Sequence, residues 1–127
     1  MSVPFDLKKG LIVVPVRVWG PKGDDLVEPA LDTGATTTLI RTAVLVALGY
    51  DPAAAPDRVQ VTTGSGVEFT PRLNISRIST LGHARAHFPI LAHTLPPTAS
   101  IDGLLGLDFL RGKRLVIDFR RARLGLH

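Results

Sequence analysis

The chain has 127 residues, 45% of them hydrophobic, so it is long enough to bury a core within one ordinary domain. It contains no cysteine, which excludes a disulfide framework and thiolate chemistry and fits a reducing compartment. The net charge is +4, and much of the basic excess lies in residues 111–127, where apolar residues interrupt it. That interruption favours strands with a solvated basic face, so we expect no nucleic-acid partner.

The sequence has no apolar stretch typical of a membrane span or a signal peptide. Its longest N-terminal apolar run, residues 11–16, contains Pro15 and is followed by Arg17. A membrane helix needs about 20 apolar residues in succession. We therefore expect no membrane association and a cytoplasmic location.

Ten prolines and twelve glycines divide the chain into short segments rich in valine, isoleucine, leucine and threonine, which is typical of an all-β domain. Residues 11–19 and 26–31 are predicted as a hairpin that turns at residues 22–25 and leads to Asp32. Residues 41–48 are predicted as a short helix capped by Gly49.

The second half of the chain predicts more hairpins. Six further strands share the same composition and the same turn residues at their ends: 58–63, 67–69, 73–81, 84–92, 115–119 and 123–126. Residues 64–66, Gly-Ser-Gly, and Gly82 are the predicted tips of two hairpins. Residues 107–111 are predicted as one or two helical turns. No repeat, linker or low-complexity tract interrupts the pattern, so we expect a single domain over residues 1–127.

Residues 30–40, Ala-Leu-Asp-Thr-Gly-Ala-Thr-Thr-Thr-Leu-Ile, are the best candidate for chemistry. The carboxylate of Asp32 follows a strand, the hydroxyl of Thr33 can hold the loop by hydrogen bonds, and Gly34 lets the backbone turn sharply. Asp-Thr-Gly is also good turn chemistry with no function attached. The tripeptide alone leaves both interpretations open.

A second segment, residues 101–110, adds specificity: Ile-Asp-Gly-Leu-Leu-Gly-Leu-Asp-Phe-Leu. The order of apolar-Asp-Thr-Gly-Ala, a Gly-Ser-Gly hairpin and this segment resembles the retropepsin-like aspartic proteases, most of all their single-domain bacterial branch. The resemblance covers about residues 11–126. It implies an all-β fold, a pepsin- or retropepsin-like closed barrel with one or two short helices.

The resemblance also implies roles for individual residues. Asp32 matches the catalytic aspartate, Thr33 the threonine that braces the two active-site loops of a dimer, and Gly34 and Ala35 the backbone that lines the substrate cleft. The segment beneath the active-site loop matches Leu104, Leu105 and Gly106. The tip of the mobile flap over the substrate matches Gly64, Ser65 and Gly66.

Two departures from the viral members concern an ion pair near their dimer interface. Thr36 and Thr37 stand where those members carry acidic residues, and Leu107 stands where they carry an arginine. Because both partners are missing, neither charge is left unpaired. The departures put the viral dimer geometry in doubt for this chain.

The function implied by the resemblance is peptide hydrolysis by an aspartic endopeptidase. Two carboxylates share one proton and activate a water molecule, and no cofactor takes part. The chain has one Asp-Thr-Gly, so a two-fold homodimer would supply the second carboxylate, with a peptide or protein as substrate. The alternative is a non-catalytic binding or assembly module of the same fold.

Other residues are weaker candidates. Asp102, Asp108 and Asp118 lack the Thr-Gly that follows Asp32, and Asp108 is expected at the start of a helical turn. His83 and His87 have a spacing that suits zinc on a helix, but their segment alternates like a strand. We therefore expect His83 and His87 on a solvated polar face and no metal site.

Overall fold

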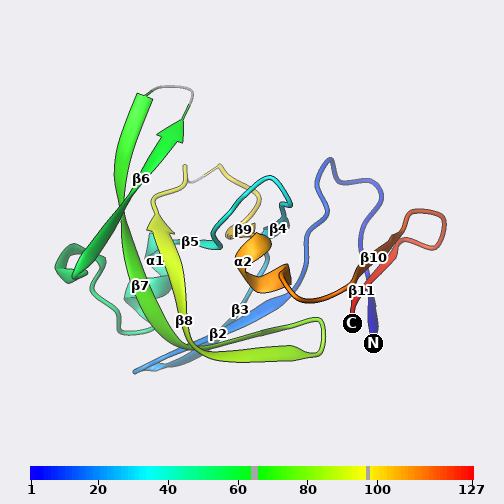
Figure 1. Ribbon diagram of the computed structural model, residues 1–127, viewed down its shortest axis with the longest axis horizontal. Helices are drawn as coiled ribbons and strands as arrows, with labels where there is room; N and C mark the ends of the chain where they lie inside the picture. Colours follow the sequence, from blue (N-terminus) through cyan, green and yellow to red (C-terminus); the bar gives the residue numbers. More distant parts are fainter. Residues whose placement is uncertain (64–65, 97) are drawn as a thin grey trace.

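The computed structural model describes residues 1–63, 66–96 and 98–127. In these ranges the strands form an eight-stranded sheet, ordered β3-β2-β7-β8-β5-β9-β4 with β6 paired to β7, and a three-stranded sheet, ordered β1-β11-β10. The larger sheet curls into a half-barrel, and the smaller sheet lies beside it with both chain ends (Figure 1). The predicted all-β fold with two short helices is confirmed.

The predicted first hairpin is confirmed in a shorter form. β2 (Val16–Gly20) pairs with β3 (Gly23–Val27), and β4 (Ala30–Leu31) is separate from β3. Residues 11–15 do not extend β2, and Val13 makes only an isolated bridge to Ala30. The sequence explains both breaks, because Pro15 and Pro29 have no N–H to donate to a sheet.

The longest strand, β7 (Gly66–Thr80), joins the two predicted central hairpins into one unit. Its first half pairs with β6 (Asp57–Thr63), and its second half pairs with β8 (His83–His93). Leu81 and Gly82, with φ of +53° and +82°, form the turn between β7 and β8. The β6–β7 hairpin projects away from the rest of the sheet (Figure 1).

Three very short strands lie side by side in the sheet, and two of them are joined by one loop. β9 (Gly103–Leu105) lies between β4, to which it is parallel, and β5 (Leu39–Arg41), to which it is antiparallel. The loop that joins β4 to β5 carries the Asp-Thr-Gly segment. Neither β5 nor β9 was predicted, because three residues are too few to show an alternating pattern.

The helices are short and lie in the connections between strands. α1 (Thr42–Ala47) follows β5 directly and is followed by Gly49, whose φ of +98° is the left-handed conformation expected of a capping glycine. A 3-10 turn, η1 (Pro52–Ala54), and α2 (Leu107–Leu110) complete the set. In the described ranges no helix is long and apolar enough to cross a bilayer.

The core is built by side chains from nearly every element. Fully buried residues include Val14, Val16, Val18, Ile40, Leu45, Ile75, Ile78, Ile90, Leu105 and Phe109. Because Leu105 lies two residues before α2 and Phe109 within it, the segment after β9 is held firmly against this core.

The three-stranded sheet is formed by the two ends of the chain. β1 (Ser2–Pro4) pairs with β11 (Arg123–Leu126), and β11 pairs with β10 (Leu115–Asp118). The strands β10 and β11 agree with the predicted last hairpin. β1 was not predicted, because a three-residue segment containing Pro4 has no strand pattern of its own.

A glycine of β9 that pairs with β5 provides the first testable prediction. A Cβ on Gly103 would overlap the carbonyl oxygen of Leu39 and lie 2.9 Å from its carbonyl carbon, and φ is +156°. Gly103→Ala should therefore lower the free energy of unfolding by about 3 kcal/mol or more, measured by urea denaturation. Gly112→Ala is the matched control, since φ is +79° and no atom lies within 4 Å of its Cβ. Its cost should be about 1 kcal/mol, and equal costs would contradict the steric argument.

Candidate active site

Asp32 begins the loop between β4 and β5, and its backbone is fixed on both sides. Its N–H donates to the carbonyl of Leu105 at 3.0 Å, and its carbonyl accepts from the N–H of Ala35 at 3.1 Å. Its Oδ1 accepts from the N–H of Gly34 at 2.8 Å, which closes a tight turn. Asp32 is half-buried, whereas Thr33 and Gly34 are exposed. The loop thus presents one carboxylate beside an uncovered backbone.

Gly106 lets the loop lie directly on the chain after β9. A Cβ at this position would be 2.9 Å from the carbonyl oxygen of Ala35 and 2.9 Å from the carbonyl carbon of Thr37. The next residue, Leu107, donates its N–H to the same Ala35 oxygen at 2.9 Å. Any side chain at position 106 would therefore push the loop outward, away from the strands that hold Asp32.

A buried threonine and an aspartate make the second tie between these segments. Asp108 accepts from the N–H of Thr38 at 2.9 Å, from the hydroxyl of Thr38 at 2.6 Å and from the N–H of Phe109 at 2.9 Å. The hydroxyl oxygen of Thr38 in turn accepts from the N–H of Gly106 at 3.1 Å, and Thr38 is 0% exposed. Donors on three residues thus satisfy the carboxylate and the hydroxyl.

In the viral proteases that the sequence resembles, an ion pair joins two segments near the dimer interface. In this chain the Thr38–Asp108 network joins the corresponding segments. Here the charge is on the helix side, and the loop side contributes neutral donors. Asp108 lies at the start of α2, as predicted. Its bond to Thr38 was missed, because nothing in the sequence shows that residues 70 positions apart meet.

The other aspartates considered from the sequence are engaged elsewhere. Asp102 Oδ2 accepts from the N–H of Glu28 at 2.8 Å, and Oδ1 lies 3.5 Å from Nε of Arg41. Asp118 accepts from two backbone N–H groups of the turn after β10, each at 3.0 Å. Within the described residues, no hydrogen bond connects Asp32 to a second carboxylate. One chain therefore offers a single carboxylate at this loop.

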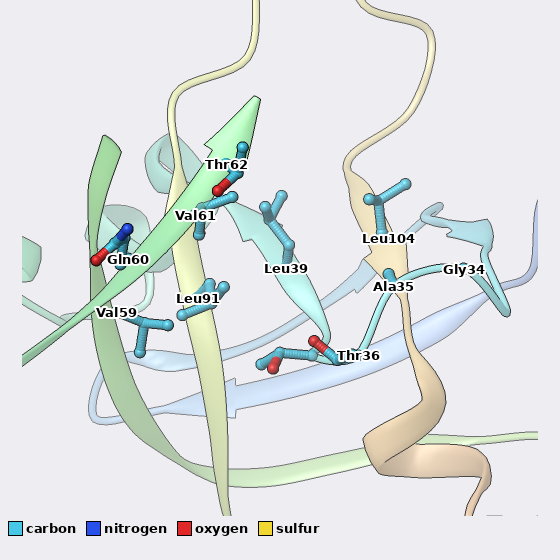
Figure 2. A pocket seen from close by; sticks show the side chains of 11 residues that line it. Gly34, Ala35, Thr36, Leu39, Val59, Gln60, Val61, Thr62, Leu91 and Leu104 are labelled. Carbon is cyan, nitrogen blue, oxygen red and sulfur yellow. The ribbon is translucent and has the colours of Figure 1, made fainter. Parts of the chain in front are cut away.

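A cleft of about 330 Å³ opens beside the Asp32 loop (Figure 2). Gly34, Ala35 and Leu104 lie on one side of it, and β6 forms the opposite side (Figure 2). The β6 residues that line it are Val59, Gln60, Val61 and Thr62. The cleft thus lies between the Asp-Thr-Gly loop and the projecting β6–β7 hairpin.

An apolar hollow of about 300 Å³ adjoins this cleft and shares Leu39, Val61 and Leu104 with it. Its other lining residues come from β7, β8, β9 and the loop before β9: Thr70, His93, Leu95, Ile101 and Gly103. The two hollows together form a mainly apolar surface that β6 borders through Val59, Gln60, Val61 and Thr62.

The expected flap falls partly outside the description. Gly64 and Ser65 lie outside the described residues. Gly66 begins β7 opposite Thr63, with φ of +130°, a conformation that favours glycine. Most of the β6 wall of the cleft could not be predicted, because only the pairing of β6 with β7 decides which of its residues face the cleft.

The polar residues of β8 are only half solvated. His83 Nε2 lies 2.8 Å from the carbonyl oxygen of Leu126, and His87 is exposed with φ of +51°. Arg85 lies over the ring of Phe109, 5.4 Å from its centroid, and donates to the Phe109 carbonyl at 3.1 Å. The face that was expected to be solvated therefore attaches β8 to α2 and β11.

Comparisons with known proteins agree with this geometry. The family model described as "Aspartyl protease" matches residues 14–109, which span the Asp-Thr-Gly loop, the β6–β7 hairpin and most of α2. The chain therefore belongs to the aspartyl protease family. No curated protein sequence matches the chain at a significant level.

Two solved structures show the same fold. A retropepsin-like aspartic protease from Rickettsia conorii superposes with a TM-score of 0.72 at 17% identity, over 98% of this chain and 86% of that one. The EIAV protease, in complex with the inhibitor HBY-793, superposes with a TM-score of 0.61 at 23% identity, over 91% of this chain and 100% of that one. The predicted retropepsin-like family and fold are confirmed.

Removing the Thr38 hydroxyl tests the tie beneath the loop. Thr38→Val keeps the shape but leaves the N–H of Gly106 without its acceptor and the carboxylate of Asp108 without one donor. We expect the free energy of unfolding to fall by about 2 kcal/mol in urea denaturation. Thr36→Val, at an exposed position of the same loop, should change it by less than about 0.5 kcal/mol. A neutral Thr38→Val variant would show that the network contributes nothing.

Proposed function

We propose that this protein is an aspartic endopeptidase that acts as a homodimer, in which Asp32 of each protomer supplies one of two catalytic carboxylates. The observation that carries the proposal is the setting of Asp32. Its carboxylate stands beside the exposed residues Thr33 and Gly34, on a loop that lines a cleft, and bonds to no other carboxylate in the described chain. Membership of the aspartyl protease family supports the same chemistry.

The proposed mechanism needs the two carboxylates to share one proton. Two carboxyl groups at hydrogen-bond distance cannot both ionise, because their negative charges would repel each other. One carboxyl therefore stays protonated while the other is charged. The charged one takes a proton from a water molecule held between them as the water oxygen attacks the peptide carbonyl carbon. The protonated one donates its proton to the carbonyl oxygen. The tetrahedral intermediate collapses when the carboxyl that took the proton of the water gives it to the amide nitrogen, the C–N bond breaks and the amine leaves.

The backbone around Asp32 keeps the carboxylate in place for this reaction. The bond from the Gly34 N–H orients Oδ1, and the bond to Leu105 anchors the residue to the core. We propose that Thr33 braces the loop against the same loop of the partner, and that Gly34 and Ala35 contact the substrate. Both Gly34 and Ala35 line the cleft, which supports this role.

We propose that the substrate is an extended peptide that lies along β6. β6 pairs only with β7 in the described ranges, so its other edge has backbone groups available for an added strand. Val61, Leu39 and Leu104 suit hydrophobic side chains on either side of the cut bond. We further propose that the hairpin tip, Gly64, Ser65 and Gly66, closes over the bound peptide as a flap.

Replacing the carboxylate tests the proposed chemistry. Asp32→Asn keeps the size of the side chain but cannot share a proton, so kcat/KM on an apolar peptide should fall about 10⁴-fold or more. Asp25→Asn, at an exposed aspartate of β3, is the matched control and should leave the rate unchanged. Activity that persists in Asp32→Asn would exclude this mechanism. A wild type that binds peptides without cleaving them would favour the non-catalytic module.

Dilution and pH test the shared site. If two protomers complete it, specific activity should rise with protein concentration until the dimer saturates, measured alongside sedimentation velocity. The rate should also be higher on the acid side of neutrality, because one proton must remain on the pair. Full specific activity in a preparation that sediments only as monomer would contradict the homodimer.

A further inference from the structure

One wall of the apolar hollow is a loop segment, residues 99–102, that has open space on both sides. Ile101 lines the hollow of about 300 Å³ described above. It also lines a second hollow, of about 250 Å³, whose other residues come mostly from the loop before β2: Lys9, Gly10, Leu11, Val13 and Ser100. Side-chain packing therefore does not by itself fix where this wall stands.

Hydrogen bonds from one arginine hold the segment. Nη2 of Arg41 donates to the carbonyl oxygen of Ile101 at 2.6 Å and to that of Ala99 at 3.3 Å. Among the described residues, residues 98–101 make one other hydrogen bond, from the N–H of Ala99 to the carbonyl of Pro96 in the same loop. The bonds from Arg41 are therefore what ties this stretch to the sheet.

The arginine reaches the segment from the strand beneath the hollow. Leu39 and Arg41 are two residues apart in β5, so their side chains leave the same face of the strand. Leu39 lines the hollow and lies between Val61 and Leu104 (Figure 2). Arg41 itself does not line the hollow, and its guanidinium bonds to the wall instead.

Asp102 places the guanidinium and anchors the end of the segment. Its Oδ1 lies 3.5 Å from Nε of Arg41, and the Arg41 and Asp102 side chains are only 20% and 32% exposed, which limits screening by water. Its Oδ2 accepts from the N–H of Glu28 at 2.8 Å, and its own N–H donates to the carbonyl of Glu28 at 3.1 Å. Its carbonyl accepts from the N–H of Arg41 at 2.8 Å. Asp102 thus joins the wall to β5 and to the chain between β3 and β4.

We infer that Arg41 is a positioning residue that sets the substrate selectivity of this site. Together with Asp102 it forms a clamp, which holds Ile101 in place and keeps the hollow shaped for a large apolar side chain of the peptide, such as leucine. This inference rests on the proposed function, because the hollow adjoins the cleft beside the Asp32 loop and shares three lining residues with it. Without the clamp the wall can move into open space, and the close contacts that favour leucine are lost.

The clamp needs a guanidinium rather than a positive charge alone. Nη2 of Arg41 serves two carbonyls, while its Nε, which is buried and forms no hydrogen bond in the described chain, lies beside the carboxylate of Asp102. A lysine ammonium is a point charge at the end of a flexible chain and cannot hold both directions at a fixed separation. Arg41→Lys should therefore keep the charge and lose the clamp.

Peptides that differ by one side chain test the inference. The probes are fluorogenic octapeptides with leucine on both sides of the central bond, and versions in which one of these leucines is alanine. In the wild type, kcat/KM should be about tenfold or more higher for leucine than for alanine at one of the two positions. In Arg41→Lys this ratio should fall below about threefold, through a higher KM for the leucine peptide and with kcat within about twofold.

Arg85→Lys is the matched control, because Nη2 of Arg85 also donates to two backbone carbonyls, at 3.1 Å and 3.5 Å, and Arg85 does not line the hollow. Both variants should unfold at lower urea concentration than the wild type, yet only Arg41→Lys should lower the leucine ratio. A ratio that falls equally in both variants, or in neither, would overturn the inference.

A second variant keeps the test decisive if Arg41→Lys does not fold. Asp102→Asn keeps the shape and the backbone bonds of the segment but removes the charge beside Nε. The leucine ratio should then fall about threefold or more. A folded Asp102→Asn variant with the wild-type ratio would overturn the role of the clamp.

A binding version of the same comparison separates this inference from the proposed function. Dissociation constants of the leucine and alanine peptides are measured by fluorescence polarisation in Asp32→Asn, with and without Arg41→Lys. A leucine preference in binding that Arg41→Lys removes, in a protein whose wild type cleaves nothing, would support the clamp and overturn the enzyme. Peptidase activity that requires Asp32, with no leucine preference or with one unchanged in Arg41→Lys, would support the enzyme and overturn the clamp.

Discussion

The close approach of residues 35–38 to residues 105–108 is the contact on which the rest of the structure depends. It exists because Gly106 has no side chain and because Thr38 and Asp108 satisfy each other in a buried position. Asp32 is bonded to Leu105 directly before this contact, so the carboxylate is held by the same packed layer. Leu105 and Phe109 then fix that layer to the core.

This arrangement holds the Asp32 carboxylate at a fixed place on the loop. The Asp32 carboxylate has one backbone donor, and the other aspartates near the ends of strands are bound by their own surroundings. A water held between two carboxylates would therefore need a second copy of the same loop.

Features set by local residue patterns could be predicted from the sequence, whereas features set by tertiary packing could not. The hairpins at Gly82 and after β10, the helix ended by Gly49 and the all-β class follow from local residue patterns, and they are confirmed. The breaks at Pro15 and Pro29, the three-residue strands and β1 were not predicted. The short strands bond to segments that are distant in the sequence, and a strand of two or three residues is too short to show an alternating pattern.

The sequence by itself determined the family, the candidate carboxylate Asp32 and the glycine-rich segment that packs beneath it. These depend on short motifs whose residue types have few substitutes, such as a glycine where a Cβ would clash. Only the tertiary structure decided that Thr38 meets Asp108 and that β6 forms the far side of the cleft. Each of these depends on which strands pair and in which register, and no local pattern in the chain encodes that pairing.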